Sequence, residues 1–328
     1  MSALSSSELT SFYPATNLER DTWVLERRAG RKTLDPQKPY LFFVEQELSA
    51  SGDILPVATI FLTNRECPWR CVMCDLWRNT LTTTVPLGAI PSQIDFALSQ
   101  LPAARVLKLY NSASFFDARA IPVEDHPAIA DRANNFERLI VENHPALVDD
   151  HCLRFRDRLK CRFEIAMGLE TVHPEVLPKL NKRMTLEQFA AAAAFLRDHE
   201  IDLRVFVLVQ PPFMQPEEAV LWAQRSVDFA FDCGATAVTL IPTRGGNGAM
   251  EALAANQQFS PPRLETLENS FNYGLGLKRG RVFADLWDAD NIPPCPACRT
   301  PRIARLRRMN LSQANLSPVR CQSCDSAN

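Results

Sequence analysis

Cys67-Pro68-Trp69-Arg70-Cys71-Val72-Met73-Cys74 places three thiols at a C-x3-C-x2-C spacing, just after the apolar run Val57-Ala58-Thr59-Ile60-Phe61-Leu62. Thiolates are soft ligands that select zinc, copper(I) or iron–sulfur clusters. Three protein ligands leave one metal position free for a substrate or cofactor. A four-iron cube held by three cysteines would likewise expose one iron. The alternative is a structural zinc loop that takes a fourth ligand from elsewhere, such as His126 or Cys161.

Length and composition limit the class of protein. The 328 residues suit one large domain with an appendage, or two domains, and 46% hydrophobic residues allow a sizeable core. A net charge of −2 does not mark a nucleic-acid binder, although a local basic patch remains compatible with it. The N-terminus lacks a signal-peptide pattern, and no apolar run reaches the roughly 20 residues that span a bilayer. We therefore expect a soluble cytoplasmic protein with no membrane partner.

Most of the ten cysteines fall into two clusters. The first is the loop above, and the second consists of two C-x2-C pairs, Cys295/Cys298 and Cys321/Cys324. Such pairs in a chain of this size indicate reduced metal ligands, not a secreted disulfide framework. Four thiolates fill a tetrahedron, so these pairs predict a structural zinc site. A second iron–sulfur cluster that transfers electrons is the alternative.

Short β-branched or apolar runs alternate with segments of helical period from Leu55 onward. The runs cover residues 57–63, 104–110, 138–142, 162–168, 202–209 and 236–241. This alternation predicts βα units and a parallel sheet, at whose carboxyl edge ligands gather. A capping box at Thr185 and Gln188 starts one of the intervening helices. The pattern alone does not separate a partial barrel from a full barrel or an open doubly wound sheet.

Polar residues follow several of these predicted strands. Asn111, Ser112 and Ser114 follow the second strand, Glu142 ends the third, Glu170 ends the fourth, and Gln210 ends the fifth. Side chains at such positions are candidates for binding a ligand at the carboxyl edge. The alternatives are an ordinary Ser/Asn turn, salt-bridged or solvated acids, and a plain turn before Pro211-Pro212.

The cysteine loop after a first strand resembles the signature of the radical S-adenosylmethionine (radical SAM) superfamily. The resemblance implies a partial (β/α)6 barrel over residues 51–248, an N-terminal extension over 1–50, and a small four-cysteine metal-binding region within 249–328. It also implies that Cys67, Cys71 and Cys74 hold a [4Fe-4S] cluster whose free iron binds SAM. Reductive cleavage of SAM then yields a 5′-deoxyadenosyl radical that abstracts hydrogen.

The same resemblance suggests which residues bind SAM. A glycine-rich stretch after the second strand binds the amino group of SAM in that superfamily, and residues 111–114 are its counterpart here, without its glycine or acid. Glu170, in Gly168-Leu169-Glu170, is the candidate acceptor for the ribose hydroxyls, with Glu142 as the runner-up. Gln210 is expected to contact SAM or substrate.

Four motifs resemble one family in particular, the radical SAM subunit of archaeosine synthase. They are Cys-Pro-Trp-Arg-Cys-Val-Met-Cys, Lys-Leu-Tyr-Asn-Ser-Ala-Ser-Phe-Phe-Asp, Gly-Leu-Glu-Thr and Gln-Pro-Pro-Phe, in that order within residues 57–245. That family breaks a C–N bond of a lysine adduct to complete a deazaguanine modification in tRNA. The resemblance implies a tRNA substrate, an electron-donor protein and a partner subunit. The chain departs from the pattern at Asp75-Leu76-Trp77 and at Ala113.

Five arginines between the two C-x2-C pairs are candidates for phosphate contacts with tRNA: Arg299, Arg302, Arg305, Arg307 and Arg308. A solvated charged face is the alternative for such a run. Two other functions stay open at this point. One is radical SAM chemistry on a free small molecule or peptide, and the other is a zinc-only nucleic-acid-binding protein.

Overall fold

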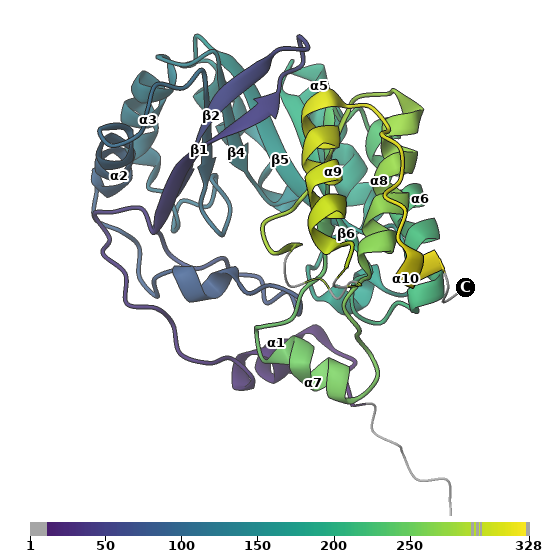
Figure 1. The fold of residues 1–328 in the computed structure, drawn as a ribbon. Helices are drawn as coiled ribbons and strands as arrows, with labels where there is room; N and C mark the ends of the chain where they lie inside the picture. The colour runs from purple at the N-terminus through teal and green to yellow at the C-terminus, as the bar shows by residue number, and fades with distance from the viewer. Residues whose placement is uncertain (1–11, 290–291, 293–294, 296, 326–328) are drawn as a thin grey trace, which may run out of the picture.

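The computed structural model describes residues 12–289, 292, 295 and 297–325, and its described strands form one eight-stranded sheet curved into a half-barrel (Figure 1). The strands lie in chain order. β1 is antiparallel to β2, and every later strand is parallel to its neighbours. The strands are β1 (Leu41–Leu48), β2 (Ile54–Phe61), β3 (Val106–Tyr110), β4 (Arg138–Glu142), β5 (Arg162–Glu170), β6 (Asp202–Val209), β7 (Ala237–Pro242) and β8 (Arg281–Ala284).

The predicted partial α/β barrel is confirmed, and the sheet is wider than the six predicted strands. Those six are β2 to β7. β1 adds an antiparallel strand from the N-terminal segment, and β8 adds a parallel strand from the C-terminal segment. The boundaries at residues 50/51 and 248/249 stay a prediction.

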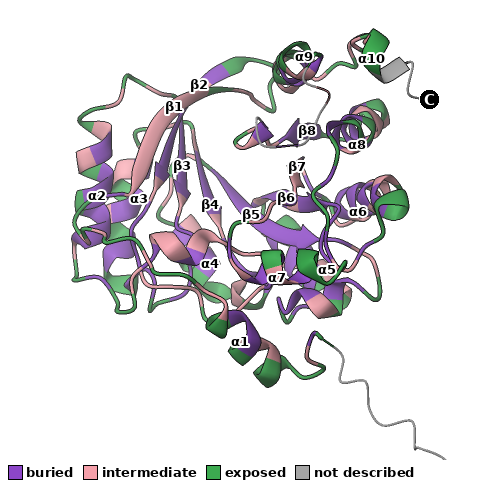
Figure 2. Ribbon diagram, turned by 60° about the horizontal axis from the view of Figure 1, so that its bottom comes forward, coloured by how far each residue is buried: buried purple, intermediate pink, exposed green. Residues whose placement is uncertain are grey.

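Helices pack on the outer face of the half-barrel, as Figure 2 shows for α2, α3, α6 and α8. The helices are α1 (Asn17–Glu26), α2 (Ala89–Leu98), α3 (His126–Ala133), α4 (Asp150–Arg156), α5 (Leu186–Asp198), α6 (Ala219–Asp232), α7 (Ala249–Ala255), α8 (Leu264–Leu277), α9 (Arg299–Ser312) and α10 (Gln322–Asp325). The predicted capping box of α5 is confirmed. α1 packs against α7 beyond one end of the barrel (Figure 1), and α9 contacts both edge strands, β1 and β8. Among the described helices, none has both the length and the apolarity needed to cross a membrane.

Side chains alternate between the two faces of each strand, and the two faces differ in chemistry. Residues such as Ile60, Leu107 and Val205 face the helices and belong to one large apolar core. The inward face carries a buried charged network near the amino-terminal ends of the strands. Its members are Glu45, Glu47, Lys108, Arg138, Glu164, Asp202, Arg204 and Arg281.

Glu164 is the centre of this charged network. Its carboxylate accepts from Arg204 Nε at 2.6 Å, from Arg138 Nη1 at 2.9 Å and from Arg281 Nη2 at 3.3 Å. Arg204 also binds Glu47 of β1 at 2.6 Å, so the network joins the first strand to β6 across the barrel. Burial alone would raise the pKa of Glu164, but the surrounding guanidinium groups lower it overall. The paired charges therefore stay ionised inside the barrel.

We expect Glu164→Ala to lower the free energy of unfolding by about 3–5 kcal/mol, because three guanidinium groups, of which those of Arg204 and Arg281 are buried, lose the carboxylate that they share. Asp95→Ala is the matched control, since it removes the carboxylate of the surface pair Arg132–Asp95 and should cost about 1 kcal/mol or less. Urea unfolding followed by circular dichroism measures both. Equal losses in the two variants would contradict this role of the network.

Candidate functional site

The cysteine loop follows β2 at the carboxyl edge of the sheet, and segments distant in sequence hold it. Asn181 Nδ2 donates to Arg70 O at 2.9 Å, and the Val72 N–H donates to Leu180 O at 3.0 Å. Asn247 Nδ2 donates to Val72 O at 2.7 Å and to Cys74 O at 3.1 Å. The loop backbone is therefore shaped by the chain after β5 and by the chain after β7.

Salt bridges hold the loop from the N-terminal side. The carboxylate of Glu66, next to Cys67, binds Arg28 at 2.6 Å and Arg70 at 3.2 Å, and it also binds Arg31. These contacts connect the segment after α1 to the start of the loop.

The three thiols of the loop face a common region. Burial, together with a smaller contribution from a neighbouring thiol of the loop, raises the pKa of Cys67, Cys71 and Cys74 to about 12. Their sulfur atoms nevertheless do not form a group within 4.8 Å of one another among the described residues. Thiolates on a single zinc ion, with Zn–S near 2.3 Å, lie closer together than that. The donor set therefore fits a group with several separated metal atoms better than it fits one ion.

Neither residue suggested as a fourth ligand lies at this loop. Cys161 immediately precedes β5, at the amino edge of the sheet. His126 stacks on Phe115 in the core under the helices, with ring centroids 5.5 Å apart. Burial lowers the pKa of His126 to about 4. Both side chains therefore lie away from the cysteine loop.

Asn111 and Glu142 meet at the carboxyl ends of β3 and β4. The Asn111 backbone N–H donates to Glu142 Oε1 at 2.5 Å. Burial raises the pKa of Glu142 to about 7 despite this and neighbouring backbone hydrogen bonds. The side chain of Asn111 is fully buried, yet neither its oxygen nor its nitrogen has a partner. A buried amide without partners is costly and indicates a ligand that supplies them.

The side-chain hydroxyls of Ser112 and Ser114 both form hydrogen bonds. Ser112 Oγ lies 2.8 Å from the hydroxyl of Tyr40, and Ser114 Oγ accepts from the His144 backbone N–H at 3.0 Å. Burial raises the pKa of Tyr40, and the Glu142 carboxylate and the Cys74 thiol raise it further, so all three groups are neighbours. Tyr40 was not predicted, because nothing in the sequence around it indicates a contact with residue 112.

Glu170 forms a buried ion pair with Lys182, and the Nζ–Oε1 distance is 2.6 Å. Burial alone would lower the pKa of Lys182, but Glu170 and the Cys71 thiol raise it overall, so the ammonium stays charged next to the cysteine loop. The sequence did not identify Lys182 as a site residue. Its position near Cys71 depends on how the segment after β5 returns to the loop.

Three of the predicted site residues have left-handed backbones, namely Ser112 (φ 53°), Glu170 (φ 66°) and Gln210 (φ 56°). A positive φ is uncommon in a residue other than glycine and is enriched at functional sites, and seven other described residues of this chain share it. Glu170 lies at a register shift between β5 and β6. Gln210 is buried, and its Nε2 donates to the carbonyl and hydroxyl oxygens of Ser260 at 2.8 and 2.9 Å.

A stacked pair supports the cysteine loop from inside. The rings of Trp69 and His144 lie parallel, with centroids 3.7 Å apart. His144 Nδ1 accepts from the Ala146 N–H, so Nε2 donates to Lys182 O at 3.1 Å. Burial, together with the nearby charge of Lys182, lowers the pKa of His144 to about 3. The ring is therefore neutral and acts as a rigid support.

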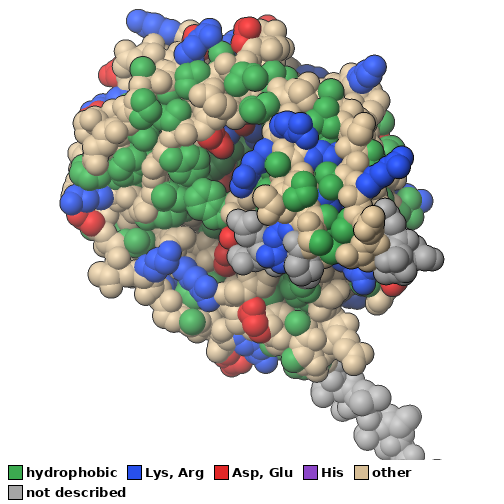
Figure 3. Space-filling view, in the orientation of Figure 1, with side chains coloured by type: hydrophobic (Ala, Val, Ile, Leu, Met, Phe, Trp, Pro, Cys, Tyr) green, Lys and Arg blue, Asp and Glu red, His purple; other side chains and the backbone are tan. Residues whose placement is uncertain are grey.

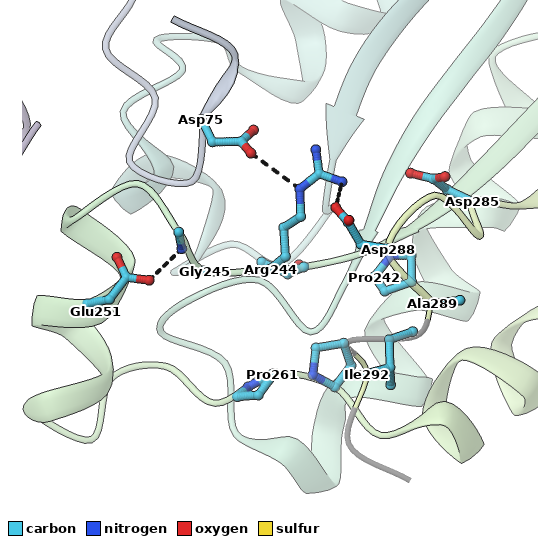
Figure 4. Close-up of a pocket in the computed structure, with 13 residues that line it drawn as sticks. Asp75, Pro242, Arg244, Gly245, Glu251, Pro261, Asp285, Asp288, Ala289 and Ile292 are labelled. Carbon is cyan, nitrogen blue, oxygen red and sulfur yellow. Dashed lines mark hydrogen bonds and ion pairs between the residues drawn. The ribbon is translucent and has the colours of Figure 1, made fainter. Parts of the chain in front are cut away.

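A cavity of about 410 Å³ lies beside the loop, at the carboxyl ends of β7 and β8. Arg244 crosses it, with Nε 3.4 Å from Asp75 and Nη1 2.7 Å from Asp288 (Figure 4). Asp285 and Thr243 also line it. This volume is in the range of small-molecule sites.

The C-terminal cysteines form a separate group. The ligand atoms of Cys295, Cys298 and Cys321 all lie within 4.8 Å of one another, and the sulfur atoms of Cys295 and Cys321 are 3.7 Å apart. That spacing suits thiolates around one tetrahedral ion. The side chain of Cys324 lies outside the described part of the structure.

The five arginines lie on α9 and differ in exposure. Arg305 is buried, donates to Leu316 O at 2.6 Å and pairs with Glu268, which Arg302 also binds at 2.9 Å. Arg299 is half-buried, whereas Arg307 and Arg308 are exposed.

The half-barrel with a three-cysteine loop after its first parallel strand is the arrangement that the motif resemblance implied. Among solved structures of this fold, Methanocaldococcus infernus Elp3 matches with a TM-score of 0.50 and 14% identity, over 66% of this chain and 57% of that chain.

Two curated proteins match this chain over most of their length. The chain is 26% identical to archaeosine synthase subunit beta of Methanosarcina acetivorans, over 80% of this chain and 82% of that protein. It is 24% identical to an uncharacterised protein of Methanocaldococcus jannaschii, over 89% and 86% of the two chains. No family model matches the chain. The resemblance predicted from the motifs is confirmed by these comparisons.

We expect Gly168→Ala to destabilise the protein by about 1–3 kcal/mol, because an added Cβ collides with the buried ends of Glu170 and Lys182. Gly30→Ala is the matched control, since nothing lies near its added Cβ, and it should change stability by about 0.5 kcal/mol or less. Urea unfolding of both variants measures the difference. If Gly168→Ala behaved like Gly30→Ala, the ion pair would not be held as the structure shows it.

Proposed function

We propose that this protein is a radical SAM enzyme whose substrate is a modified nucleoside in tRNA. The main support is the pairing of a three-thiol loop with the partnerless, fully buried amide of Asn111 at the same edge of the barrel. Cys67, Cys71 and Cys74 would hold a [4Fe-4S] cluster. When bound, the reduced cluster and SAM supply a 5′-deoxyadenosyl radical that abstracts hydrogen from the substrate.

The residues of the chain prepare this site in three ways. The ammonium of Lys182, charged next to Cys71, offsets part of the negative charge that three thiolates bring. The free oxygen and nitrogen of Asn111 offer one acceptor and donors to the polar groups of SAM. Glu170 offers a carboxylate to the ribose hydroxyls while Lys182 holds its orientation, and Ser112, Ser114 and Gln210 shape the same edge.

A second metal is part of the proposal. Cys295, Cys298 and Cys321, with Cys324, would hold a zinc ion that joins the start of α9 to the C-terminal tail. The close spacing of the first three ligand atoms supports one ion over a second cluster. Because all these thiols must stay reduced, the reducing cytoplasm suits the protein.

The tRNA substrate is supported by the name of the Methanosarcina relative, archaeosine synthase subunit beta. That name also supports a partner subunit, and the reductive step requires an electron-donor protein. Arg307 and Arg308 are exposed on α9 and free to contact phosphates, whereas Arg302 and Arg305 hold Glu268. Chemistry on a free small molecule or peptide is the rival within radical SAM enzymes.

Anaerobic reconstitution should give about four irons per chain at the loop, in line with a [4Fe-4S] cluster. Metal analysis should then show that Cys71→Ala loses iron and keeps zinc, whereas Cys298→Ala keeps iron and loses zinc, because the two thiol groups are separate. With dithionite and SAM, the wild type should form 5′-deoxyadenosine and Cys71→Ala should not. Zinc without iron in the wild type would favour the zinc-only protein, and loss of iron in Cys298→Ala would favour a second cluster.

Binding of bulk tRNA tests the substrate class. Replacing Arg307 and Arg308 by Ser should weaken tRNA binding and reduce the slope of log K against log salt by about 2, because each arginine neutralises about one phosphate. The control replaces Arg154 and Arg197, which are exposed on α4 and α5. Filter binding over a salt series measures both. Absent or salt-independent binding by the wild type would favour the small-molecule or peptide rival.

A further inference from the structure

Aromatic side chains line the inside of the half-barrel above the charged network. Strand alternation turns Phe43, Phe61, Tyr110 and Phe206 inward. Ring centroids lie 6.1 Å apart for Phe43 and Phe61, 5.9 Å for Phe61 and Tyr110, and 6.2 Å for Tyr110 and Phe206. The inside of a complete barrel is filled by layers of side chains, but here all four rings remain partly exposed. Figure 3 shows hydrophobic side chains around a hollow between β1 and α9.

Trp287 extends this aromatic cluster to the rim. It follows β8, is 59% exposed and stacks on Phe43, with centroids 5.6 Å apart and an angle of 24° between the rings. A large aromatic ring that is both held by a neighbour and open to solvent is suited to stacking on a planar ligand. Proteins bind unpaired bases in this way, at about 1–3 kcal/mol per base.

Polar groups next to the cluster could bind the edge of a ring. The backbone N–H of Trp287 donates to Asp285 Oδ1 at 2.9 Å, and Asp285 also lines the 410 Å³ cavity, which Figure 4 shows. Asp285 is half-buried, and this burial raises its pKa. On the inward face of β7, the buried hydroxyl oxygen of Thr239 has no partner. A carboxylate matches the paired N–H donors of a guanine-type edge.

The aromatic cluster is continuous with the site proposed for SAM. The rings of Tyr40 and Phe61 have centroids 5.6 Å apart, and the hydroxyl of Tyr40 contacts Ser112 beside Glu142. A ring held by the cluster would therefore lie next to the proposed source of the radical. A base can reach this position only after it leaves the helical stack of the RNA.

We propose that the cluster of Phe43, Phe61, Tyr110, Phe206 and Trp287 binds the heterocyclic base of the substrate, stacked on Trp287 with its N–H edge toward Asp285. This assignment rests on the proposed function and specifies which part of the nucleoside enters the barrel. It makes Trp287 and Asp285 the residues that select a guanine-type base.

The test uses the full-length, anaerobically reconstituted protein with saturating SAM. The probe is a short single-stranded RNA with one 7-deazaguanosine, and the reference is the same RNA with an abasic site at that position. Fluorescence anisotropy of labelled RNA should show that the wild type binds the base-bearing RNA more tightly than the abasic one. Trp287→Ala should weaken binding of the base-bearing RNA by about 5-fold or more and remove its advantage over the abasic RNA. Trp287→Phe should keep most of that advantage, because it keeps a ring.

Leu221→Ala is the control, since it removes another exposed apolar side chain, on α6, and should leave both affinities unchanged. Equal binding of the two RNAs by the wild type, or an unaltered preference in Trp287→Ala, would overturn the assignment. So would tighter binding of a peptide with a free aromatic residue than of the base-bearing RNA.

The two proposals fail in different ways. A wild type that forms 5′-deoxyadenosine but does not distinguish the two RNAs would refute the base site and leave the radical SAM function standing. A wild type that distinguishes the two RNAs but holds no iron after reconstitution would refute the radical SAM function and leave the base site standing.

Discussion

The buried contact between Glu164 and Arg204 is the constraint on which the rest of the half-barrel depends. A half-barrel leaves its inner face without the layers of apolar side chains that fill a closed barrel. Here charged side chains fill the part of that face near the amino-terminal ends of the strands. Through their ion pairs, Glu164 and Glu47 bring β1, β4, β6 and β8 together. Because each buried charge has its partner, the curvature of the sheet is specified without a closed barrel.

The division of the inner face into a charged half and an aromatic half has consequences for chemistry. Charged side chains fill the amino-terminal end of the inner face, which leaves the carboxyl edge as the place where a ligand would bind. At the carboxyl edge the chain places its thiols, the unpaired amide of Asn111 and the strained residues Ser112, Glu170 and Gln210. Neutral supports such as His144 keep the loop rigid without adding charge. The shape of the site therefore depends on packed neutral side chains such as His144 as well as on its polar groups.

The parts of the fold with local signals were predictable from the sequence. The six parallel strands follow from alternation of apolar runs, and the two cysteine groups follow from spacing. β1 has a mixed signal in the sequence, because its inward side carries Glu45 and Glu47 as well as Phe43. The charged network was missed for the same reason, since a buried Glu164 looks like a solvated acid in sequence. Tyr40 and Lys182 have no local signal, because their contacts depend on segments far apart in the chain.

The contacts of Asn247 bear on the order in which this protein can mature. The loop of Cys67 to Cys74 emerges from the ribosome early, but its backbone is held by Asn181 and by Asn247, which are synthesised much later. A nascent chain that stops short of residue 247 lacks the hydrogen bonds that shape the loop. Under the proposed function, delivery of iron and sulfide to a correctly formed loop would therefore belong to a late, largely post-translational stage of biogenesis.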